Sequence, residues 1–188
     1  GIPEDTREHY MNRGKLVHKA IYYIIRFIKE LESQSNPPEI INGIISDYIE
    51  KLDSQIKKYV ESFNCFRLDP QIGLHIVASE ERVYSEDLDV AGTLDLFGVM
   101  RFRNGAEAFL GDYKCGEHYE EYGYQSAGYV ICKFRNTPHR RVGIHLNRDG
   151  KMPRLIEHDS VLDYYHFKQA VKEFYSKEDY YTNLKVRR

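Results

Sequence analysis

The 188-residue sequence contains no tryptophan, only three cysteines and no long apolar run. Cys65, Cys115 and Cys132 are too few and too scattered for a disulfide framework, and sparse thiols are typical of a reducing compartment. No stretch approaches the roughly 18 apolar residues that cross a bilayer, and we recognise no signal peptide. We therefore expect no membrane partner and a cytoplasmic location.

The sequence also lacks a strong charge of one sign, internal repeats and low-complexity tracts. Its 27 basic and 29 acidic residues give a formal net charge of −2, whereas a protein that coats nucleic acid would be strongly basic. A local basic groove beside an acidic metal cluster would still fit this balance. No linker divides the chain, so its length predicts one domain over residues 1–188.

The first third carries two apolar stripes at helical spacing. The first covers residues 15–30, and Asn36-Pro37-Pro38 then breaks the chain. The second stripe runs from Ile41 to Phe63 and predicts one helix that ends near Asn64. The N-terminal helices are thus expected within residues 14–63.

The pattern then changes to that of strands. Residues 72–86, 88–102 and 107–115 predict three strands, with a turn at Glu86-Asp87 and a hairpin at Asn104-Gly105. Antiparallel pairing across that hairpin places positions 95 and 112 near each other, because both lie at a similar distance from the turn.

The rest of the chain predicts a helix, two strands and a second helix, over residues 119–134, 140–147, 153–158 and from Asp159 or Ser160 to about Tyr175. Asn136-Thr137-Pro138 ends the first of these helices, and a basic tail over residues 177–188, loose at its end, follows the second. The order of elements, α-α-β-β-β-α-β-β-α, predicts an α/β fold whose sheet and covering helices lie within residues 72–176.

Asp112 and Lys114 are the most informative residues, because they interrupt an apolar strand. Residues two apart in a strand point to the same face, so both side chains project together, and the hairpin brings Asp95 beside them. Leu94 and Leu96 flank Asp95, and a buried acid needs a partner. Two carboxylates and an ammonium can hold a divalent metal and orient water for phosphodiester hydrolysis. The alternative is a surface Asp–Lys pair on an edge strand.

The helix that follows carries Gln125 and Tyr129, which share a face at i, i+4 spacing. Beside a carboxylate–lysine pair they would contact a nucleic-acid backbone or fix the lysine, and simple helix packing is the alternative. Cys115 and His118 suggest zinc, but no second ligand pair at zinc spacing follows, and we discount this interpretation.

Three segments, in this order, resemble the motifs of the PD-(D/E)XK nuclease superfamily, in particular its RecB-like and phage-type exonucleases. They are Ala91-Gly92-Thr93-Leu94-Asp95, Gly111-Asp112-Tyr113-Lys114 and Gln125-Ser126-Ala127-Gly128-Tyr129. The family patterns read G-x-x-D, D-x-K and Q-x-x-x-Y. The resemblance covers about residues 14–145 and implies the restriction-endonuclease-like core (αβββαβ), a central mixed sheet flanked by helices.

The resemblance also implies roles for residues of the first two motifs. Asp95 and Asp112 would be ligands of Mg²⁺ or Mn²⁺, and the backbone of Tyr113 would complete the ligand set. Lys114 would be the catalytic lysine.

Further roles follow from the same resemblance. Gln125 and Tyr129 would be the functional pair on the helix. Glu80 matches an additional acidic metal ligand on the first strand, but Glu81 is a rival, because a slip of one residue flips the face. His18 resembles a helix histidine that some branches place near the metal, with a partly exposed helix residue as the alternative.

Basic residues near the first helix and after the Gln–Tyr helix would track phosphates or else form solvated faces; they are Arg13, Lys15, Lys19, Lys133, Arg135, Arg140 and Arg141. Three tyrosines in the first part of that helix would stack on the bases of a single strand, although three glutamates beside them would repel DNA. These residues are Tyr119, Tyr122, Tyr124, Glu117, Glu120 and Glu121.

We therefore expect a metal-dependent DNA nuclease, an exonuclease of phage or recombination type in a bacterial or phage-infected cell. Its substrate would be single- or double-stranded DNA, and a second copy or a recombination protein would be its partner. Two alternatives stay open: an inactive nucleic-acid-binding or assembly subunit with the same fold, and a metal hydrolase with another substrate.

Overall fold

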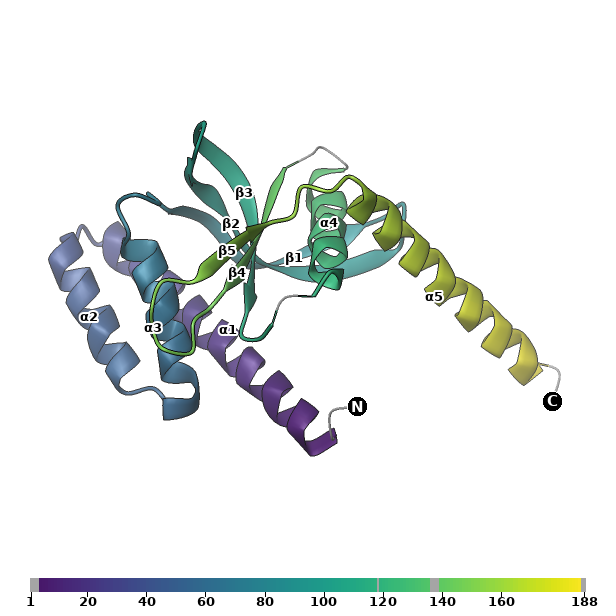
Figure 1. The fold of residues 1–188 in the computed structure, drawn as a ribbon, viewed down its shortest axis with the longest axis horizontal. Helices are drawn as coiled ribbons and strands as arrows, with labels where there is room; N and C mark the ends of the chain where they lie inside the picture. Colours follow the sequence, from purple (N-terminus) through teal and green to yellow (C-terminus); the bar gives the residue numbers. More distant parts are fainter. Residues whose placement is uncertain (1–3, 118, 136–138, 187–188) are drawn as a thin grey trace.

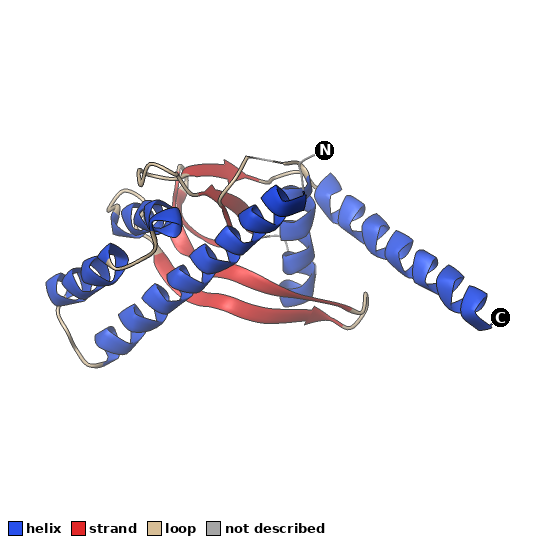
Figure 2. Cartoon of the chain, turned by 90° about the horizontal axis from the view of Figure 1, so that it is seen from below, coloured by secondary structure: helices blue, strands red, loops and turns tan. Residues whose placement is uncertain are grey.

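The sheet determines the architecture. A computed structural model, which describes residues 4–117, 119–135 and 139–186, contains a five-stranded mixed sheet with helices packed against both faces (Figure 1; Figure 2). The predicted α/β class is confirmed. None of the described helices has the length and apolar content needed to traverse a bilayer.

Three helices precede the sheet: α1 (Glu4–Ser33), α2 (Pro38–Glu50) and α3 (Ser54–Leu68). The prediction of one helix across residues 41–63 is wrong, because the chain turns between α2 and α3. Asp53 caps α3, and its carboxylate accepts a hydrogen bond of 2.8 Å from the backbone N–H of Gln55. This cap satisfies a backbone donor at the start of α3, so the apolar stripe continues while the helix does not.

The five strands lie in the order in which they occur in the chain: β1 (His75–Ser85), β2 (Val90–Phe102), β3 (Gly105–Lys114), β4 (Arg140–His145) and β5 (Arg154–Glu157). Neighbouring strands are antiparallel except β3 and β4, which are parallel and joined through helix α4 (Glu121–Phe134). The predicted β2–β3 hairpin is confirmed, but its turn residues are Arg103 and Asn104. Gly105 follows as the first residue of β3 and has a positive φ, which glycine tolerates.

Strands β2 and β3 separate before they end. Their mutual pairing stops at Leu96 and Gly111, after which β2 continues along β1 and β3 continues along β4. The next positions on the two strands are Asp95 and Asp112. The sheet therefore forks at the two acids that the sequence singles out.

Two apolar clusters cover the two faces of the sheet. The larger joins α1, α2 and α3 to the sheet through residues such as Phe109 and Tyr113, and the smaller joins α4 to it through Leu94 and Leu110. The neighbours Phe109 and Leu110 thus point to opposite faces, as strand alternation requires. The side chains on the two faces can meet across the sheet only where the strands part.

Helix α5 (Leu162–Val186) begins beside α4 and then leaves the body of the protein (Figure 1; Figure 2). The prediction that this helix ends near Tyr175 is wrong, because α5 continues to Val186. The looseness of the tail stays a prediction. The segment contains neither glycine nor proline, so nothing in it interrupts the helix. His118 and the predicted helix breaker at 136–138 lie outside the described residues, as do positions 187–188.

Candidate active site

The fork in the sheet leaves peptide groups of Tyr113 without a β2 backbone partner, and two side chains take them up. The N–H of Tyr113 donates a hydrogen bond of 2.8 Å to Asp95 Oδ2, and the carbonyl oxygen of Tyr113 lies 3.1 Å from His18 Nε2. The carbonyl of Lys114 accepts from Leu146 N on the other side of β3. Asp95 and His18 are therefore fixed to the backbone of the D-x-K segment.

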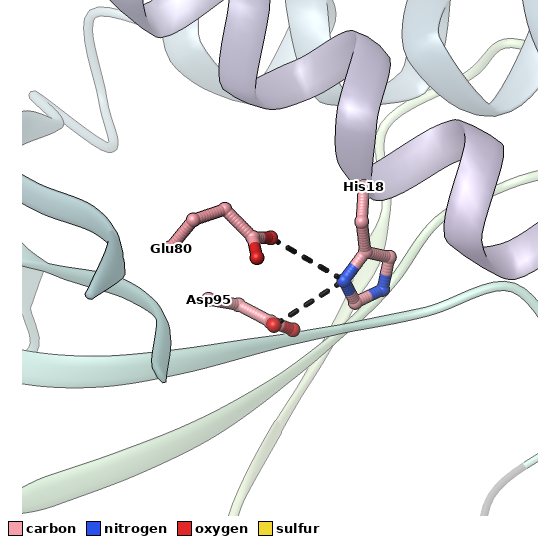
Figure 3. A group of neighbouring side chains, drawn as sticks. All are labelled: His18, Glu80 and Asp95. Carbon is pink, nitrogen blue, oxygen red and sulfur yellow. Dashed lines mark ion pairs between the residues drawn. The ribbon is translucent and has the colours of Figure 1, made fainter. Parts of the chain in front are cut away.

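His18, Glu80 and Asp95 converge from α1, β1 and β2 (Figure 3). His18 Nδ1 lies 3.2 Å from Asp95 Oδ1 and 3.6 Å from Glu80 Oε1. One potential ligand atom from each residue lies within 4.8 Å of the other two. Of the rivals on the first strand, Glu80 belongs to this cluster, whereas Glu81 pairs with Lys133 at 2.6 Å.

A backbone irregularity gives Glu80 this position. Glu80 has φ of 50°, which a residue with a side chain adopts at a cost of about 1–3 kcal/mol. The strand register places it opposite Asp95, between the pairs Ser79–Leu96 and Glu81–Leu94. Leu94 and Leu96 pack in different clusters although they are two residues apart. Strict alternation therefore fails at Glu80 and Asp95.

In this cluster, burial and the contacts between charged groups shift the pKa values of His18 and Asp95 in opposite directions. Burial lowers the pKa of His18, but hydrogen bonds and charge interactions with Asp95 and Glu80 outweigh it and raise that pKa to about 10. Burial alone would raise the pKa of Asp95, yet its hydrogen bonds with His18, Asp112 and the Tyr113 N–H hold that pKa below its usual value. Without a metal, the His18 imidazolium is thus a cation between two carboxylates.

Asp112 lies on the other side of the fork and has a different environment. Its side chain is almost fully buried, and burial together with the charge of Asp95 raises its pKa to about 8, against the opposing effect of Lys114. Lys114 Nζ lies 2.6 Å from Asp112 Oδ2. The two side chains project together, as strand spacing predicts. Asp112 is not a member of the three-residue cluster, so its predicted role as a metal ligand is a less direct fit than that of Asp95.

Of the helix pair, Gln125 contacts the lysine directly and Tyr129 contacts Gln125. Lys114 Nζ donates a hydrogen bond of 2.9 Å to Gln125 Oε1, and Gln125 Nε2 donates one of 2.7 Å to the hydroxyl of Tyr129. The ring of Tyr129 lies over Gly92, where a Cβ would come within 2.8 Å of Tyr129 Cε1. The glycine of the first segment thus makes room for the tyrosine of the third.

The site also contains buried carboxylate oxygens with spare capacity. Glu80 Oε1 and Asp112 Oδ2 are buried and have no hydrogen-bond partner of good geometry among the described residues, although each lies in an ion pair. Buried acceptors of this kind are costly unless a donor or cation approaches them. The donor set of an imidazole, carboxylates and a carbonyl therefore fits a divalent cation.

A groove of about 420 Å³ leads away from Glu80 along helix α1. Its lining consists of Gly14, Lys15, His18, Lys19, Tyr22 and Glu80. Lys15 and Lys19 are exposed, so two ammonium groups are available beside the acidic cluster. A local basic groove of this kind is compatible with the nearly balanced net charge of the sequence.

Several other basic residues are engaged elsewhere. Arg141 is buried and pairs with Asp163 at 2.8 Å, Arg140 pairs with Glu107 and Glu157, and Lys133 pairs with Glu81. The expectation that these three residues follow phosphates is therefore not supported.

The sequence analysis did not predict that Tyr122 contacts Lys114. Lys114 Nζ lies 4.1 Å from the ring centroid of Tyr122, within cation–π range. The i, i+3 spacing of Tyr122 and Gln125 was the available signal, because it places both on one helix face.

A search of known protein-family models and of characterised proteins finds no match to this chain.

Proposed function

We propose that the protein is a metal-dependent nuclease of the PD-(D/E)XK superfamily with a restriction-endonuclease-like core, which hydrolyses DNA as an exonuclease of phage or recombination type. The proposal is supported by the way in which the three motif-like segments are joined. Asp95 accepts a hydrogen bond from the N–H of Tyr113, and Lys114 donates one to Gln125. The ring of Tyr129 lies over Gly92. Each segment thus contacts both of the others at one site.

The residues that would hold the metal are His18, Glu80 and Asp95, with the carbonyl of Tyr113 and the carboxylate of Asp112 on their flanks. Carboxylate and carbonyl oxygens suit Mg²⁺ and Mn²⁺, and an imidazole nitrogen favours the transition metal of the two. Metal binding must displace the proton of His18, because only the neutral imidazole has a lone pair to donate.

A divalent cation in this cluster would polarise a phosphoryl oxygen and lower the pKa of a bound water. The protein's own contribution is orientation. Lys114 is held by Asp112 and Gln125, so its ammonium is fixed where it can orient the attacking water or stabilise charge on the phosphorane. Lys15 and Lys19 would bind phosphates of the strand that approaches along the groove.

The observation that carries the proposal is the convergence of three ligand-bearing side chains within 4.8 Å, one strand away from an ion-paired lysine. It is tested by incubating end-labelled single- and double-stranded DNA with the protein and Mn²⁺, with and without a chelator. Cleavage that the chelator abolishes is expected.

Asp95→Asn is the matched test variant, because its amide oxygen can still accept the Tyr113 N–H while the charge is lost. Asp87→Asn, at an exposed turn, is the control. We expect calorimetric Mn²⁺ binding to weaken by more than about tenfold in the first variant only. Unchanged binding in Asp95→Asn, or cleavage that resists the chelator, would refute the metal site. Metal and DNA binding without cleavage would indicate the inactive binding subunit instead.

A further inference from the structure

An aromatic pair continues the site beyond the lysine. The ring of Tyr122 lies under Lys114 Nζ, and the ring of Tyr119 meets that of Tyr122 edge-to-face, with centroids 5.6 Å apart and planes at 89°. Tyr119 is 51% exposed. The contacts therefore run from Lys114 through a half-buried ring to a ring that faces solvent.

This pair contacts Lys114, whereas the basic groove is lined by Glu80 and His18. A chain of contacts leads from Glu80 through His18 to Asp95, and from Asp95 through the Asp112 carboxyl to Lys114. The exposed lysines of the groove flank the first end of this chain of contacts, and Tyr119 flanks the last. The contacts of the site thus begin beside two exposed lysines and end beside an exposed aromatic ring.

The charge around Tyr119 is negative. Glu117, Glu120 and Glu121 are all exposed, and the charge of Glu121 reaches the Tyr122 ring, whose pKa is raised first by burial and then by Tyr119 and its acidic neighbours. We call these three glutamates the acidic rim. Phosphates are repelled by such a rim, whereas the face of a base carries no charge and can stack on an exposed phenol ring.

We propose that Tyr119 is a stacking platform for an unpaired base of the substrate strand, and that the acidic rim excludes the phosphates of a second strand. This proposal deepens the proposed nuclease function and rests on it: the substrate would be single-stranded or frayed DNA. The backbone of the bound strand follows Lys15 and Lys19, and its bases reach Tyr119 across Lys114.

The test separates binding from cleavage. Affinity for a fluorescent oligothymidine and for a blunt duplex is measured by anisotropy in Ca²⁺, and cleavage of both is measured in Mn²⁺. We expect the single strand to bind more tightly and to be cleaved faster. Tyr119→Ala should weaken single-strand binding by about 5- to 100-fold, the usual effect of removing one base–aromatic stack. Tyr119→Phe should bind like the wild type, because it keeps the ring.

Tyr84→Ala is the control, since Tyr84 is 52% exposed on β1 and its hydroxyl bonds to Asp89 near the hairpin turn. It should not change oligothymidine binding. Replacing the three glutamates of the acidic rim with glutamine should raise duplex affinity more than single-strand affinity.

The outcomes are distinguishable. This inference is wrong if the single strand and the duplex are bound and cleaved equally well, or if Tyr119→Ala binds oligothymidine normally. Either result would leave the nuclease proposal intact. Binding of a single strand that depends on Tyr119, without cleavage in Mn²⁺, would support the stacking platform and count against the nuclease.

Discussion

Replacement of Lys114 by methionine separates a catalytic role of this lysine from a structural one. Methionine keeps an unbranched apolar stem of similar length but removes the ammonium group. Two contacts are lost: the ion pair with Asp112 at 2.6 Å and the hydrogen bond to Gln125 at 2.9 Å. Both partners then have to be satisfied in another way.

The stability cost can be estimated from the state of Asp112. Removal of one partner of a buried ion pair costs about 3–5 kcal/mol when it leaves an uncompensated charge. Asp112 has a pKa of about 8, so its carboxyl is already mostly protonated at pH 7; loss of Lys114 raises that pKa further, and no unpaired charge is left. The remaining loss is that of ordinary hydrogen bonds, about 1–2 kcal/mol.

The effect on cleavage should be larger than this. Loss of one fixed charge-stabilising donor costs about 100- to 1000-fold in turnover. We expect Lys114→Met to lose at least about 100-fold in cleavage while it stays folded and loses at most about tenfold in DNA affinity, because most affinity comes from phosphate contacts elsewhere.

Lys133→Met is the matched control. Lys133 is also a largely buried lysine, with 18% of its side chain exposed compared with 13% for Lys114, and it also pairs with a carboxylate, that of Glu81. Unfolding in urea, cleavage in Mn²⁺ and DNA binding in Ca²⁺ are measured for both variants. Cleavage by Lys114→Met within about threefold of the wild type would remove the lysine from the mechanism, and an equal loss in Lys133→Met would point to a general structural effect.

Three further outcomes test the site. Glu80→Gln should weaken Mn²⁺ binding by more than about tenfold in calorimetry and Glu81→Gln should not; the reverse result would mean that the strand register at the site is wrong. The pKa of Asp112 is about 8 in the folded protein against 3.8 in the unfolded chain, and that of His18 is about 10 against 6.5. Between pH 4 and 10 the folded protein should therefore bind more protons than the unfolded chain at these two residues, and its melting temperature in chelator should fall as pH rises. A melting temperature that rises with pH would contradict these pKa values. Gly92→Ala should displace the tyrosine ring above it and lower turnover without weakening metal binding; unchanged turnover would show that the ring does not support the lysine.

The parts of the fold that local chemistry determines were predictable from the sequence. Alternating apolar residues and the Asn104-Gly105 turn gave the β2–β3 hairpin, and the hairpin gave the approach of Asp95 and Asp112. The spacing of Gln125 and Tyr129 placed both on the helix face that meets Lys114. These predictions needed only side-chain periodicity and one turn signal.

Other features are not determined by apolar periodicity. The stripe from residue 41 to 63 keeps its apolar period across the break between α2 and α3, so only the cap formed by Asp53 marks the boundary. The choice between Glu80 and Glu81 depends on the positive φ of Glu80, and periodicity assumes that no such irregularity exists. Sequence spacing likewise could not show that Arg141 would be buried against Asp163 rather than face solvent.

The fork in the sheet explains why the proposed metal ligands are also contacts that hold the fold together. Where β2 leaves β3, the peptide groups of Tyr113 need partners, and a bare break in the ladder would leave a buried donor and acceptor unsatisfied. Asp95 and His18 satisfy them, and in doing so they place a carboxylate and an imidazole at the same point. Without a metal, the protonated His18 lies between the carboxylates of Asp95 and Glu80, and the Asp112 carboxyl, with its pKa of about 8, contacts Lys114. The buried acids are therefore compensated in the folded protein. If the proposed function is right, a divalent cation would replace the proton of His18 while Asp95 keeps its hydrogen bond to the Tyr113 N–H, so metal binding would require no refolding.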